Sequence, residues 1–390
     1  MSAIQNEVKI LADQNIPFVS EAFATLGHVV THPGREITPE SISDADVLLV
    51  RSVTKVGPEL LAGSSVKLVA TATIGHDHID VPYLDEQGIG FASAPGSNAN
   101  SVAEYVFSAL CVLSRGQDFN WRDKTVGMIG CGNVGSNLLK KLRGLDVECL
   151  VNDPPLQEHT GGPDFVTLED ILSCDIVTLH VPLEFGGRYP TYRMVDEAFL
   201  SSMRTNSVLI NTSRGSVVDE KALLEWLDKA GHVAVLDVWE NEPRINTKLL
   251  EKVKIGTPHI AGYSYDGKVR GTQMVYEATC EYFNIPPTWN PQDQLPTEPV
   301  KQRSFSEIED DNEVIETAIL ASYDVRRDDA SLRKIDELPH EERTTYFDSL
   351  RRDYPIRREF HCTQISIPEE RTGLANKLKA LGFKVVLRRI

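Results

Sequence analysis

The sequence lacks the features that mark several common classes of protein. Its six cysteines are scattered and include no Cys-x-x-Cys pair, a distribution that suits a reducing cytoplasm rather than a disulfide framework. No apolar run approaches the roughly 20 residues that cross a bilayer. The first residues also lack the basic and apolar regions of a signal peptide. We therefore expect a cytoplasmic protein with no membrane partner and no metal site.

Basic residues are also in the minority. The chain carries 40 Lys and Arg against 57 Asp and Glu, which gives a formal net charge of −17. This charge argues against a nucleic-acid partner. It does not exclude an anionic substrate, because a local cluster of Arg and Lys can dominate a cleft. No internal repeat or low-complexity tract appears, and 390 residues predict two or three domains.

The pattern that is present centres on residues 125–153, which read as strand, glycine turn, helix, strand and acid. Gly130 permits a tight turn, Gly132 lets the backbone approach a pyrophosphate, and Gly135 lets the helix pack close to the sheet. The helix that begins near Asn133 and Val134 offers free N–H groups to phosphates. The stretch predicts a dinucleotide site, and a purely structural glycine turn is the less favoured interpretation.

An acidic residue, Asp153, ends the second strand of this unit, 18 residues after Gly135. An acid at this position accepts hydrogen bonds from the adenosine ribose hydroxyls and repels a 2′-phosphate. No basic group follows in Pro154-Pro155-Leu156. The sequence therefore predicts NAD as the cofactor rather than NADP.

Six short apolar strands are expected in the sheet that holds this unit, separated by segments that can form helices. Such alternation is typical of a doubly wound dinucleotide domain with a parallel sheet. A long apolar helix over about 101–114 precedes the sheet and is too short to cross a membrane. The strands are expected at residues 126–129, 147–151, 175–181, 207–212, 233–238 and 254–256.

Residues 8–95 show a similar alternation, which implies another parallel α/β sheet. Ligands lie beyond the carboxyl ends of such strands, so the loops 51–55 and 71–77 are candidate substrate loops. We favour a functional role for Arg51 and Lys55, whereas Ser52 and Thr73 are equally compatible with ordinary polar turns. The strands are expected at 8–12, 46–50, 67–70 and 89–92, with helices over 17–26 and 79–87.

After residue 258 the chain enters a helix over about 268–283 that could return to the first domain. Residues 285–303 are rich in Pro, Gln and Asn and read as a linker. Residues 304–390 are dense in Arg and mix helix and strand signals, with a helix over 313–322 and a strand over 364–367. Interaction or oligomerisation is the expected role of this last part.

Three chemically capable residues follow successive strands of the second sheet: Arg214, Glu242 and His259. Their types suit the oxidation of a 2-hydroxy acid, in which a hydride passes to NAD and the hydroxyl loses a proton. His259 can accept that proton near neutral pH, and Glu242 can orient the imidazole. Arg214 offers a planar fork of donors to a carboxylate and the C2 oxygen. Each residue alone could be structural, but together they favour catalysis.

Four motifs, taken in order, resemble the signatures of the D-isomer-specific 2-hydroxyacid dehydrogenases. They are Gly130-Cys-Gly-Asn-Val-Gly135, Asn211-Thr-Ser-Arg-Gly-Ser-Val-Val-Asp219, Leu236-Asp-Val-Trp-Glu-Asn-Glu-Pro243 and Thr257-Pro-His-Ile260, and the resemblance covers about residues 8–285. It implies that Arg214, Glu242 and His259 are catalytic and that Asp237 contacts the nicotinamide carboxamide. It also implies that Val181, Thr212, Ser213, Arg214 and Gly262 line the cofactor.

Further motifs at 51–55, 71–73, 259–263, 267–271 and 323–330 resemble a branch of this family that acts on a phosphorylated 2-hydroxy acid. Members of the branch carry a C-terminal dimerisation domain, so the resemblance implies a homodimer. It also implies substrate contacts from Ser52, Thr73 and Tyr263. The basic residues that suit a phosphate are Arg51, Lys55, Arg270 and, from a partner subunit, Arg326.

The resemblance implies an α/β fold with three domains. Residues 1–95 with 260–285 would form a discontinuous, flavodoxin-like substrate domain, and residues 96–259 a doubly wound Rossmann domain for NAD. Residues 286–390 would form a small α+β dimerisation domain.

Two other functions stay open at this point. One is another dehydrogenase of the same family, such as a 3-phosphoglycerate dehydrogenase, which the catalytic motifs do not separate. The other is a non-catalytic protein that senses dinucleotides. The complete set of Arg214, Glu242 and His259 argues against the sensor.

Overall fold

A computed structural model describes residues 7–115, 119–161, 165–229, 231–291, 301–305 and 310–389. The chain divides into two compact units. The first comprises Met1–Asn98 and Tyr265–Glu298, and the second comprises Ala99–Ser264 and Pro299–Ile390. The first unit is therefore discontinuous in sequence. The division into three domains, with boundaries near residues 95, 259 and 285, stays a prediction.

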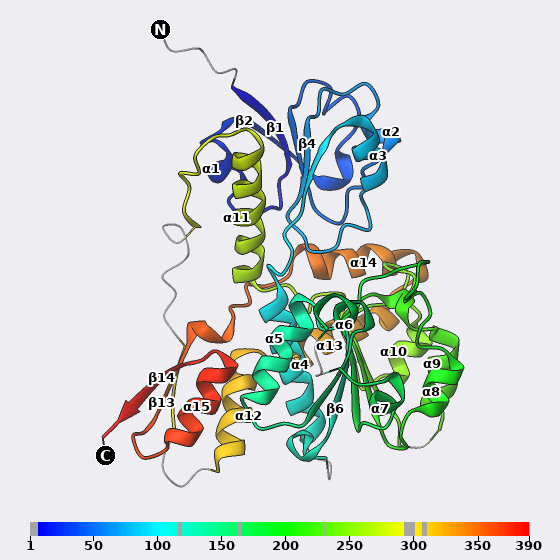
Figure 1. Cartoon of the computed structure of the whole chain (residues 1–390), viewed down its shortest axis with the longest axis vertical. Helices are drawn as coiled ribbons and strands as arrows, with labels where there is room; N and C mark the ends of the chain where they lie inside the picture. Colours follow the sequence, from blue (N-terminus) through cyan, green and yellow to red (C-terminus); the bar gives the residue numbers. More distant parts are fainter. Residues whose placement is uncertain are drawn as a thin grey trace. The chain divides into compact units, whose positions relative to one another are not determined.

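The first unit is built on a five-stranded parallel sheet in the order β2-β1-β3-β4-β5 (Figure 1). This is the flavodoxin-like order, and it confirms the sequence prediction. The central strands β3 and β4 are buried at every position, as their unbroken apolar runs predict. The elements are β1 (Val8–Asp13), α1 (Val19–Phe23), β2 (Gly27–His32), β3 (Val47–Val50), α2 (Pro58–Leu61), β4 (Leu68–Thr71), α3 (Val81–Gln87), β5 (Gly90–Ala92) and α11 (Tyr265–Tyr282).

Strand β2 (Gly27–His32) was not expected from the sequence. It lies at the edge of the sheet and pairs with β1 alone. No residue in it is fully buried, so its sequence Gly-His-Val-Val-Thr-His lacks the apolar run that marked the other strands. The predicted helix over 17–26 is shorter in the structure, where α1 spans Val19–Phe23.

The second unit contains a six-stranded parallel sheet in the order β7-β6-β8-β9-β10-β11. The chain passes from β7 back across β6 to form β8, so the strand order reverses beside β6. In open α/β sheets the ligand crevice lies at such a reversal. All six predicted strands are present: β6 (Val126–Ile129), β7 (Cys149–Asn152), β8 (Ile176–Leu179), β9 (Val208–Asn211), β10 (Val233–Leu236) and β11 (Ile255–Gly256).

Helix α4 (Ala99–Ser114) is the long apolar helix that the sequence predicted. Thirteen of its 16 residues are buried, which is typical of a helix that lies inside a core rather than on its surface. It packs against α5 (Asn133–Arg143) and against α12 (Asp311–Ser322). The remaining helices around this sheet are α6 (Pro154–Thr160), α7 (Leu168–Leu172), α8 (Glu197–Ser202), α9 (Glu220–Leu227) and α10 (Thr247–Lys252).

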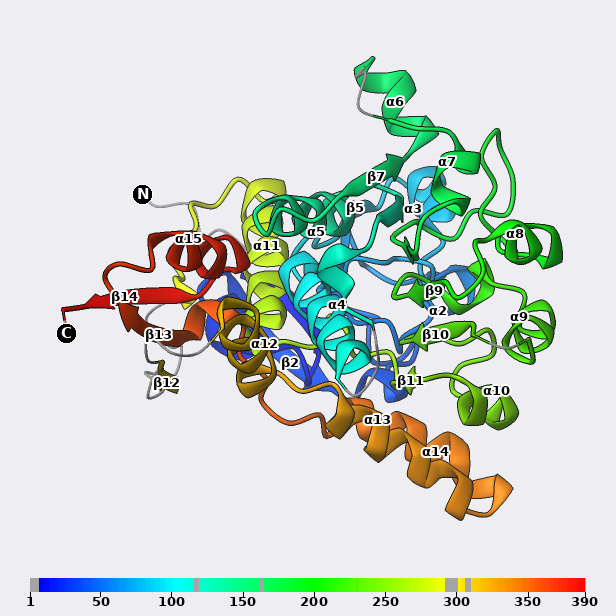
Figure 2. The same cartoon turned by 90° about the horizontal axis from the view of Figure 1, so that it is seen from below.

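The C-terminal residues form a small three-stranded parallel sheet in the order β12-β13-β14 (Figure 2). Their apolar side chains join those of α4 and β6 in one hydrophobic core. Strand β12 overlaps the linker predicted over 285–303, so that prediction was wrong for residues 301–303; residues 292–300 lie outside the described residues. The elements are β12 (Lys301–Ser304), α12 (Asp311–Ser322), α13 (Arg326–Arg333), α14 (His340–Arg352), β13 (Thr363–Pro368), α15 (Thr372–Leu381) and β14 (Lys384–Arg388).

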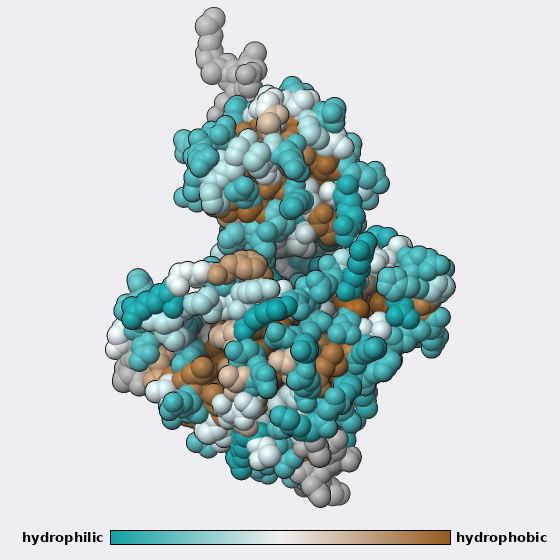
Figure 3. Space-filling model, turned by 90° about the vertical axis from the view of Figure 1, so that its right-hand side faces the viewer, coloured by the Kyte–Doolittle hydropathy of each residue, from teal (hydrophilic) through white to brown (hydrophobic). Residues whose placement is uncertain are grey.

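Within the described part of the chain, no helix is both long enough and apolar enough to cross a membrane. The face drawn in Figure 3 is mainly hydrophilic, and its hydrophobic residues lie in small separate groups.

Candidate active site

The glycine turn after β6 needs its glycines for steric reasons. Gly130 has a φ of +89°, and a Cβ on it would lie 2.5 Å from the carbonyl oxygen of His180. A Cβ on Gly135 would lie 2.2 Å from the carbonyl oxygen of Gly130. A Cβ on Gly132 would meet no atom of the described residues within 4 Å. Gly130 and Gly135 thus serve close packing, whereas Gly132 faces open space where a cofactor can approach.

Helix α5 begins at Asn133 directly after this turn, and no side chain of the described residues caps its N-terminus. The first N–H groups of a helix have no partner within the helix itself. At Asn133 and Val134 they are therefore available to an anion, and the helix dipole favours a negative charge there. The turn and the helix together fit the pyrophosphate of a dinucleotide.

Asp153 follows β7 and organises the same turn. Its Oδ2 accepts a hydrogen bond of 2.7 Å from the N–H of Cys131. Its Oδ1 accepts one of 3.0 Å from the N–H of Leu156 and so caps α6. The carboxylate is only partly buried, and its remaining lone pairs can accept the ribose hydroxyls that the sequence analysis assigned to it.

Asp237, at the end of β10, holds the loop that carries His259. The buried carboxylate accepts hydrogen bonds from the Thr257 hydroxyl (2.6 Å) and from the N–H groups of Ile260 (2.8 Å) and Ala261 (2.9 Å). Burial raises the pKa of Asp237, although the charge of His259 and these hydrogen bonds oppose that rise. The predicted contact of Asp237 with the nicotinamide carboxamide stays a prediction.

His259 and Glu242 form the central pair of the site. The Nδ1 atom of His259 lies 2.7 Å from Oε2 of Glu242, whose Oε1 accepts a hydrogen bond of 2.9 Å from the N–H of Trp239. The backbone of His259 is left-handed, with a φ of +58°, and its N–H donates to the Asp237 carbonyl at 2.7 Å. Such a conformation is rare outside glycine and is often found at functional sites.

Arg214 follows β9, at the next strand end of the sheet. Its Nη1 donates to the Ser213 carbonyl at 2.8 Å. Asn211 fixes this turn, because its side chain donates to the Arg214 carbonyl at 2.9 Å and accepts from both the N–H and the hydroxyl of Ser213. Asn211 belongs to the Asn211–Asp219 motif, but nothing in the sequence indicated that its side chain holds the turn.

His180 follows β8 and was also missed. Its ring nitrogens lie 3.0 Å from the Thr178 hydroxyl and 3.3 Å from the Thr212 hydroxyl. Burial lowers the pKa of His180 to about 3, so the ring is neutral at physiological pH. The His180 ring thus contacts the hydroxyl of Thr212, which the sequence predicts to line the cofactor. Val181 lies beside it, and its Cγ1 would be 2.9 Å from a Cβ on Gly130.

The predicted substrate residues of the first unit follow adjacent strands. Arg51 and Ser52 follow β3, and Thr73 follows β4, whose Thr71 pairs with Val50. The Nε of Arg51 donates to the buried carboxylate of Asp13 at 3.0 Å. The hydroxyl of Thr73 donates to the Gly75 carbonyl at 3.0 Å. The structure thus brings these strand ends together at one edge of the sheet.

The other predicted substrate residues are more dispersed. Lys55 is exposed. Arg270, in α11, donates from its Nε to the Ser97 carbonyl at 2.9 Å. Arg326 is paired with Asp324 at 2.6 Å on the surface. Tyr263 belongs to the second unit and follows Gly262 on the loop after His259.

Tyr105 and Arg351 also contact the loop that carries His259, and no sequence motif indicated either residue. The hydroxyls of Tyr105 and Thr257 lie 2.8 Å apart, and both groups are buried. Arg351, in α14, lies with its guanidinium carbon 5.8 Å from the centre of the Tyr263 ring. Tyr105 and Arg351 are distant from the loop in sequence, so only the fold could show their positions.

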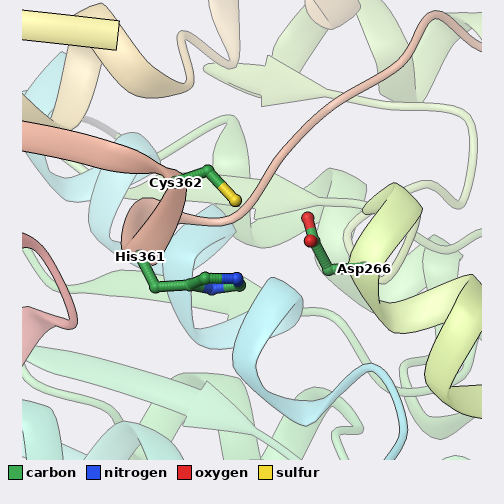
Figure 4. A group of neighbouring side chains, drawn as sticks. All are labelled: Asp266, His361 and Cys362. Atoms are coloured by element: carbon green, nitrogen blue, oxygen red, sulfur yellow. The ribbon is translucent and has the colours of Figure 1, made fainter. Parts of the chain in front are cut away.

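Three other side chains of types that ligate metals are drawn in Figure 4. His361 and Cys362 are consecutive residues of a short 3-10 helix (Phe360–Cys362), and Asp266 lies in the first turn of α11. No metal site follows from them, because Asp266 belongs to the first unit and the other two belong to the second.

The doubly wound sheet and its glycine turn define an NAD-binding domain of the D-isomer specific 2-hydroxyacid dehydrogenases. Residues 113–261 match the family model described as "D-isomer specific 2-hydroxyacid dehydrogenase, NAD binding domain". Residues 294–382 match one described as "Domain of unknown function (DUF3410)".

Curated relatives extend over almost the whole chain. An erythronate-4-phosphate dehydrogenase of Marinobacter nauticus is 46% identical over 96% of this chain and 99% of its own. One of Proteus mirabilis is 45% identical over 96% of this chain and 99% of its own. The chain belongs to the erythronate-4-phosphate dehydrogenase family.

Solved structures resemble a smaller part of the chain. The NAD-bound 3-phosphoglycerate dehydrogenase of Entamoeba histolytica has a TM-score of 0.61, at 24% identity, over 73% of this chain and 99% of its own. A D-lactate dehydrogenase of Aquifex aeolicus, in complex with NAD and lactic acid, has a TM-score of 0.58, at 26% identity, over 70% of this chain and 95% of its own. The predicted α/β class and Rossmann domain are thus confirmed.

Proposed function

We propose that this chain oxidises 4-phospho-D-erythronate to 3-hydroxy-2-oxo-4-phosphobutanoate with NAD, as a step in pyridoxal 5′-phosphate biosynthesis. The observation that carries the proposal is the His259–Glu242 pair, with 2.7 Å between Nδ1 and Oε2, on loops that follow strands of the sheet that also bears the dinucleotide turn. Relatives of that name over nearly the full length support the choice of substrate.

Bound NAD supplies the acceptor for the hydride that leaves C2 of the acid. Gly132 and the first N–H groups of α5 would hold its pyrophosphate, Gly130 and Gly135 permit the tight turn and the close packing of the helix, and Asp153 would hold the adenosine ribose. His259 accepts the proton of the C2 hydroxyl at Nε2, because Nδ1 is held by Glu242. Glu242 stabilises the imidazolium that results, and Arg214 binds the carboxylate and the C2 oxygen.

Glu242 is suited to this role because it is ionised. Burial acts to raise its pKa, but the charge of His259, the hydrogen bond to His259 and the charge of Arg351 together lower the pKa below its usual value. A lowered carboxylate pKa means that the ionised form is lost only as the pH falls. We therefore expect the oxidation rate to decline toward acid pH.

We further propose that the first unit provides the substrate domain, with Ser52, Thr73 and Arg51 near the acid. The C-terminal domain would mediate a homodimer, and the protein would act in the cytoplasm. Sedimentation of the purified chain checks the dimer, and a monomeric mass at micromolar concentration would refute it.

Absorbance at 340 nm tests the reaction when NAD is added with 4-phospho-D-erythronate, 3-phosphoglycerate or D-lactate in turn. We expect NADH formation with the four-carbon phosphate at a kcat/KM at least 100-fold above that for the others. Faster turnover of 3-phosphoglycerate would assign the chain to that reaction instead. Tight NADH binding without turnover of any acid would favour the dinucleotide sensor.

Replacement of Arg51 by Ala should raise KM for the phosphorylated acid by about 10- to 100-fold and leave KM for NAD nearly unchanged. A charge-assisted hydrogen bond of this kind contributes about 1.5–3 kcal/mol. Asp13 holds the Nε of Arg51 at 3.0 Å and thereby orients the rest of the fork. Steady-state kinetics in both substrates measure the effect.

Lys67→Ala provides a matched control, since Lys67 is an exposed basic residue of the same unit and pairs with Asp46. Equal rises in both KM values for Arg51→Ala would contradict the assignment of Arg51 to the phosphate.

A further inference from the structure

Arg351 is an unusual residue of the C-terminal domain because the Nε of its guanidinium is buried near the loop that carries His259. It is the penultimate residue of α14 (His340–Arg352), and its guanidinium carbon lies 5.8 Å from the centre of the Tyr263 ring. Its Nε is buried and has no hydrogen-bond partner among the described residues. Leaving a buried donor unpaired is costly, so such a group in a native protein calls for an explanation.

Arg351 interacts with two residues of the candidate site, Glu242 and Tyr263, and with Asp348 of its own helix. Its charge acts on Glu242 and helps His259 to lower the pKa of that carboxyl. Burial alone would lower the pKa of Arg351, but Tyr263, Glu242 and Asp348 raise it above its usual value. Glu242, His259 and Tyr263 all belong to the part of the unit that contains the NAD-binding sheet, whereas Arg351 belongs to the C-terminal domain.

The residues that follow α14 pack against the loop that carries His259. The ring of Tyr354 meets that of Tyr263 edge to face, with 5.8 Å between their centres. Arg357 is buried and donates to the Ala261 carbonyl at 3.1 Å and to the Ser101 carbonyl at 2.6 Å. The loop that carries His259 is thus packed against this segment of the C-terminal domain over several residues.

We propose that Arg351 is a positioning residue for the dehydrogenase reaction, which acts through Glu242 and Tyr263 and couples the C-terminal domain to catalysis. The inference rests on the proposed function for the reaction itself. A positive charge that acts on Glu242 keeps the proton on His259 rather than on the carboxylate after the proton has left the substrate. Contact with the guanidinium fixes the ring of Tyr263, a predicted substrate residue.

The test compares Arg351→Gln with Arg351→Lys and with Arg352→Gln. Arg352 is the next residue of the same helix but is exposed and pairs with Asp353, so it is a matched control. We expect Arg351→Gln to lower kcat about tenfold and to move the acid limb of the kcat profile to higher pH. Arg351→Lys should keep the acid limb in place but raise KM for the acid, because lysine lacks the planar fork.

A second readout requires no substrate. The titration of the Glu242 carboxyl, followed by carbon-13 NMR and assigned with Glu242→Gln, should move to higher pH in Arg351→Gln and stay in place in Arg352→Gln. An unchanged Glu242 titration would overturn the proposal. Absence of turnover by the wild-type protein would overturn the proposed function instead, and the NMR comparison would still decide the role of Arg351.

NADH binding, measured by fluorescence, confirms that each variant folds, because Arg351 is remote in sequence from the glycine turn and Asp153. If Arg351→Gln does not bind NADH, Arg351→Met replaces it, since methionine keeps an unbranched apolar stem. Two results together would leave Arg351 without a role in the reaction. Arg351→Lys would have the KM values and pH profile of the wild type, and the Glu242 titration would stay in place in Arg351→Gln or Arg351→Met.

Discussion

Replacement of His259 by Gln is expected to lower kcat for the oxidation of 4-phospho-D-erythronate by about 10²- to 10⁴-fold at neutral pH. Glutamine can occupy the position and form a hydrogen bond, but it cannot accept the hydroxyl proton. Binding of NADH should change little, because the pyrophosphate and ribose sites lie on other strand ends. Steady-state kinetics and NADH fluorescence together separate the two effects.

The structure holds His259 by both its backbone and its ring. The backbone of His259 is held in the left-handed region by its N–H bond to the Asp237 carbonyl, and Glu242 fixes the ring at 2.7 Å. Glu242→Gln should also lower kcat, since a neutral amide does not stabilise the imidazolium. His340→Gln, at an exposed position of α14, serves as the control. A His259→Gln protein with more than a tenth of the wild-type kcat would refute this role.

Replacement of Glu104 by Gln is expected to remove a loss of stability that Glu104 causes as the pH rises from about 5 to about 8. Glu104 is buried in α4, where burial first and then repulsion from Glu359 raise its pKa to about 8. The side chain of Asn100 donates to both carboxylates at 2.9 Å. The N–H of Phe360 also donates to Glu104 at 2.8 Å, while the other oxygen of Glu104 has no partner among the described residues.

The sign of the effect follows from this raised pKa. Below the usual pKa of a glutamate, the carboxyl is protonated in both the folded and the unfolded chain. Between that value and about 8, the folded chain holds a proton that the unfolded chain has lost, so the free energy of unfolding falls as the pH rises. Each pH unit costs about 1.4 kcal/mol. Stability present at low pH is thus lost as the pH rises through the folded pKa.

Glutamine is neutral at every pH and keeps the oxygen that accepts from Asn100 and Phe360. We expect Glu104→Gln to match the wild type near pH 5 and to exceed its free energy of unfolding by about 2–4 kcal/mol at pH 8. Urea unfolding followed by tryptophan fluorescence measures this, because Trp121, Trp226 and Trp239 all belong to the second unit. Glu225→Gln, on the exposed face of α9, is the control. Parallel pH curves for Glu104→Gln and the wild type would contradict the prediction.

Much of the fold could be predicted because buried parallel strands have short apolar runs in their sequences. The six strands of the NAD-binding sheet and four of the five strands in the first unit were predicted in this way. Strand β2 escaped because its two valines are flanked by His and Thr residues and no residue in it is fully buried. Strand β12 also escaped, since all four of its residues are exposed.

The candidate site divides in a similar way. Arg214, Glu242 and His259 could be found because each follows a predicted strand within a local motif. Arg351 and Tyr105 could not, because they meet the His259 loop only through tertiary packing. The carboxylate of Glu359 near Glu104 could not be predicted either, because the two residues are far apart in sequence and meet only in the folded chain.

The first unit is discontinuous, and this has a consequence for synthesis on the ribosome. Its core includes Val275 and Tyr276 of α11, which pack with residues of β1 and α1. The amino-terminal 98 residues leave the ribosome first but cannot complete that core until some 180 more residues have been made. The second unit is completed later still, because Leu381 and Phe383 belong to its core. The apolar faces of β1 and α1 therefore stay uncovered until α11 has left the ribosome, and the core of the second unit stays incomplete until α15 has followed, which leaves apolar surface exposed on the nascent chain.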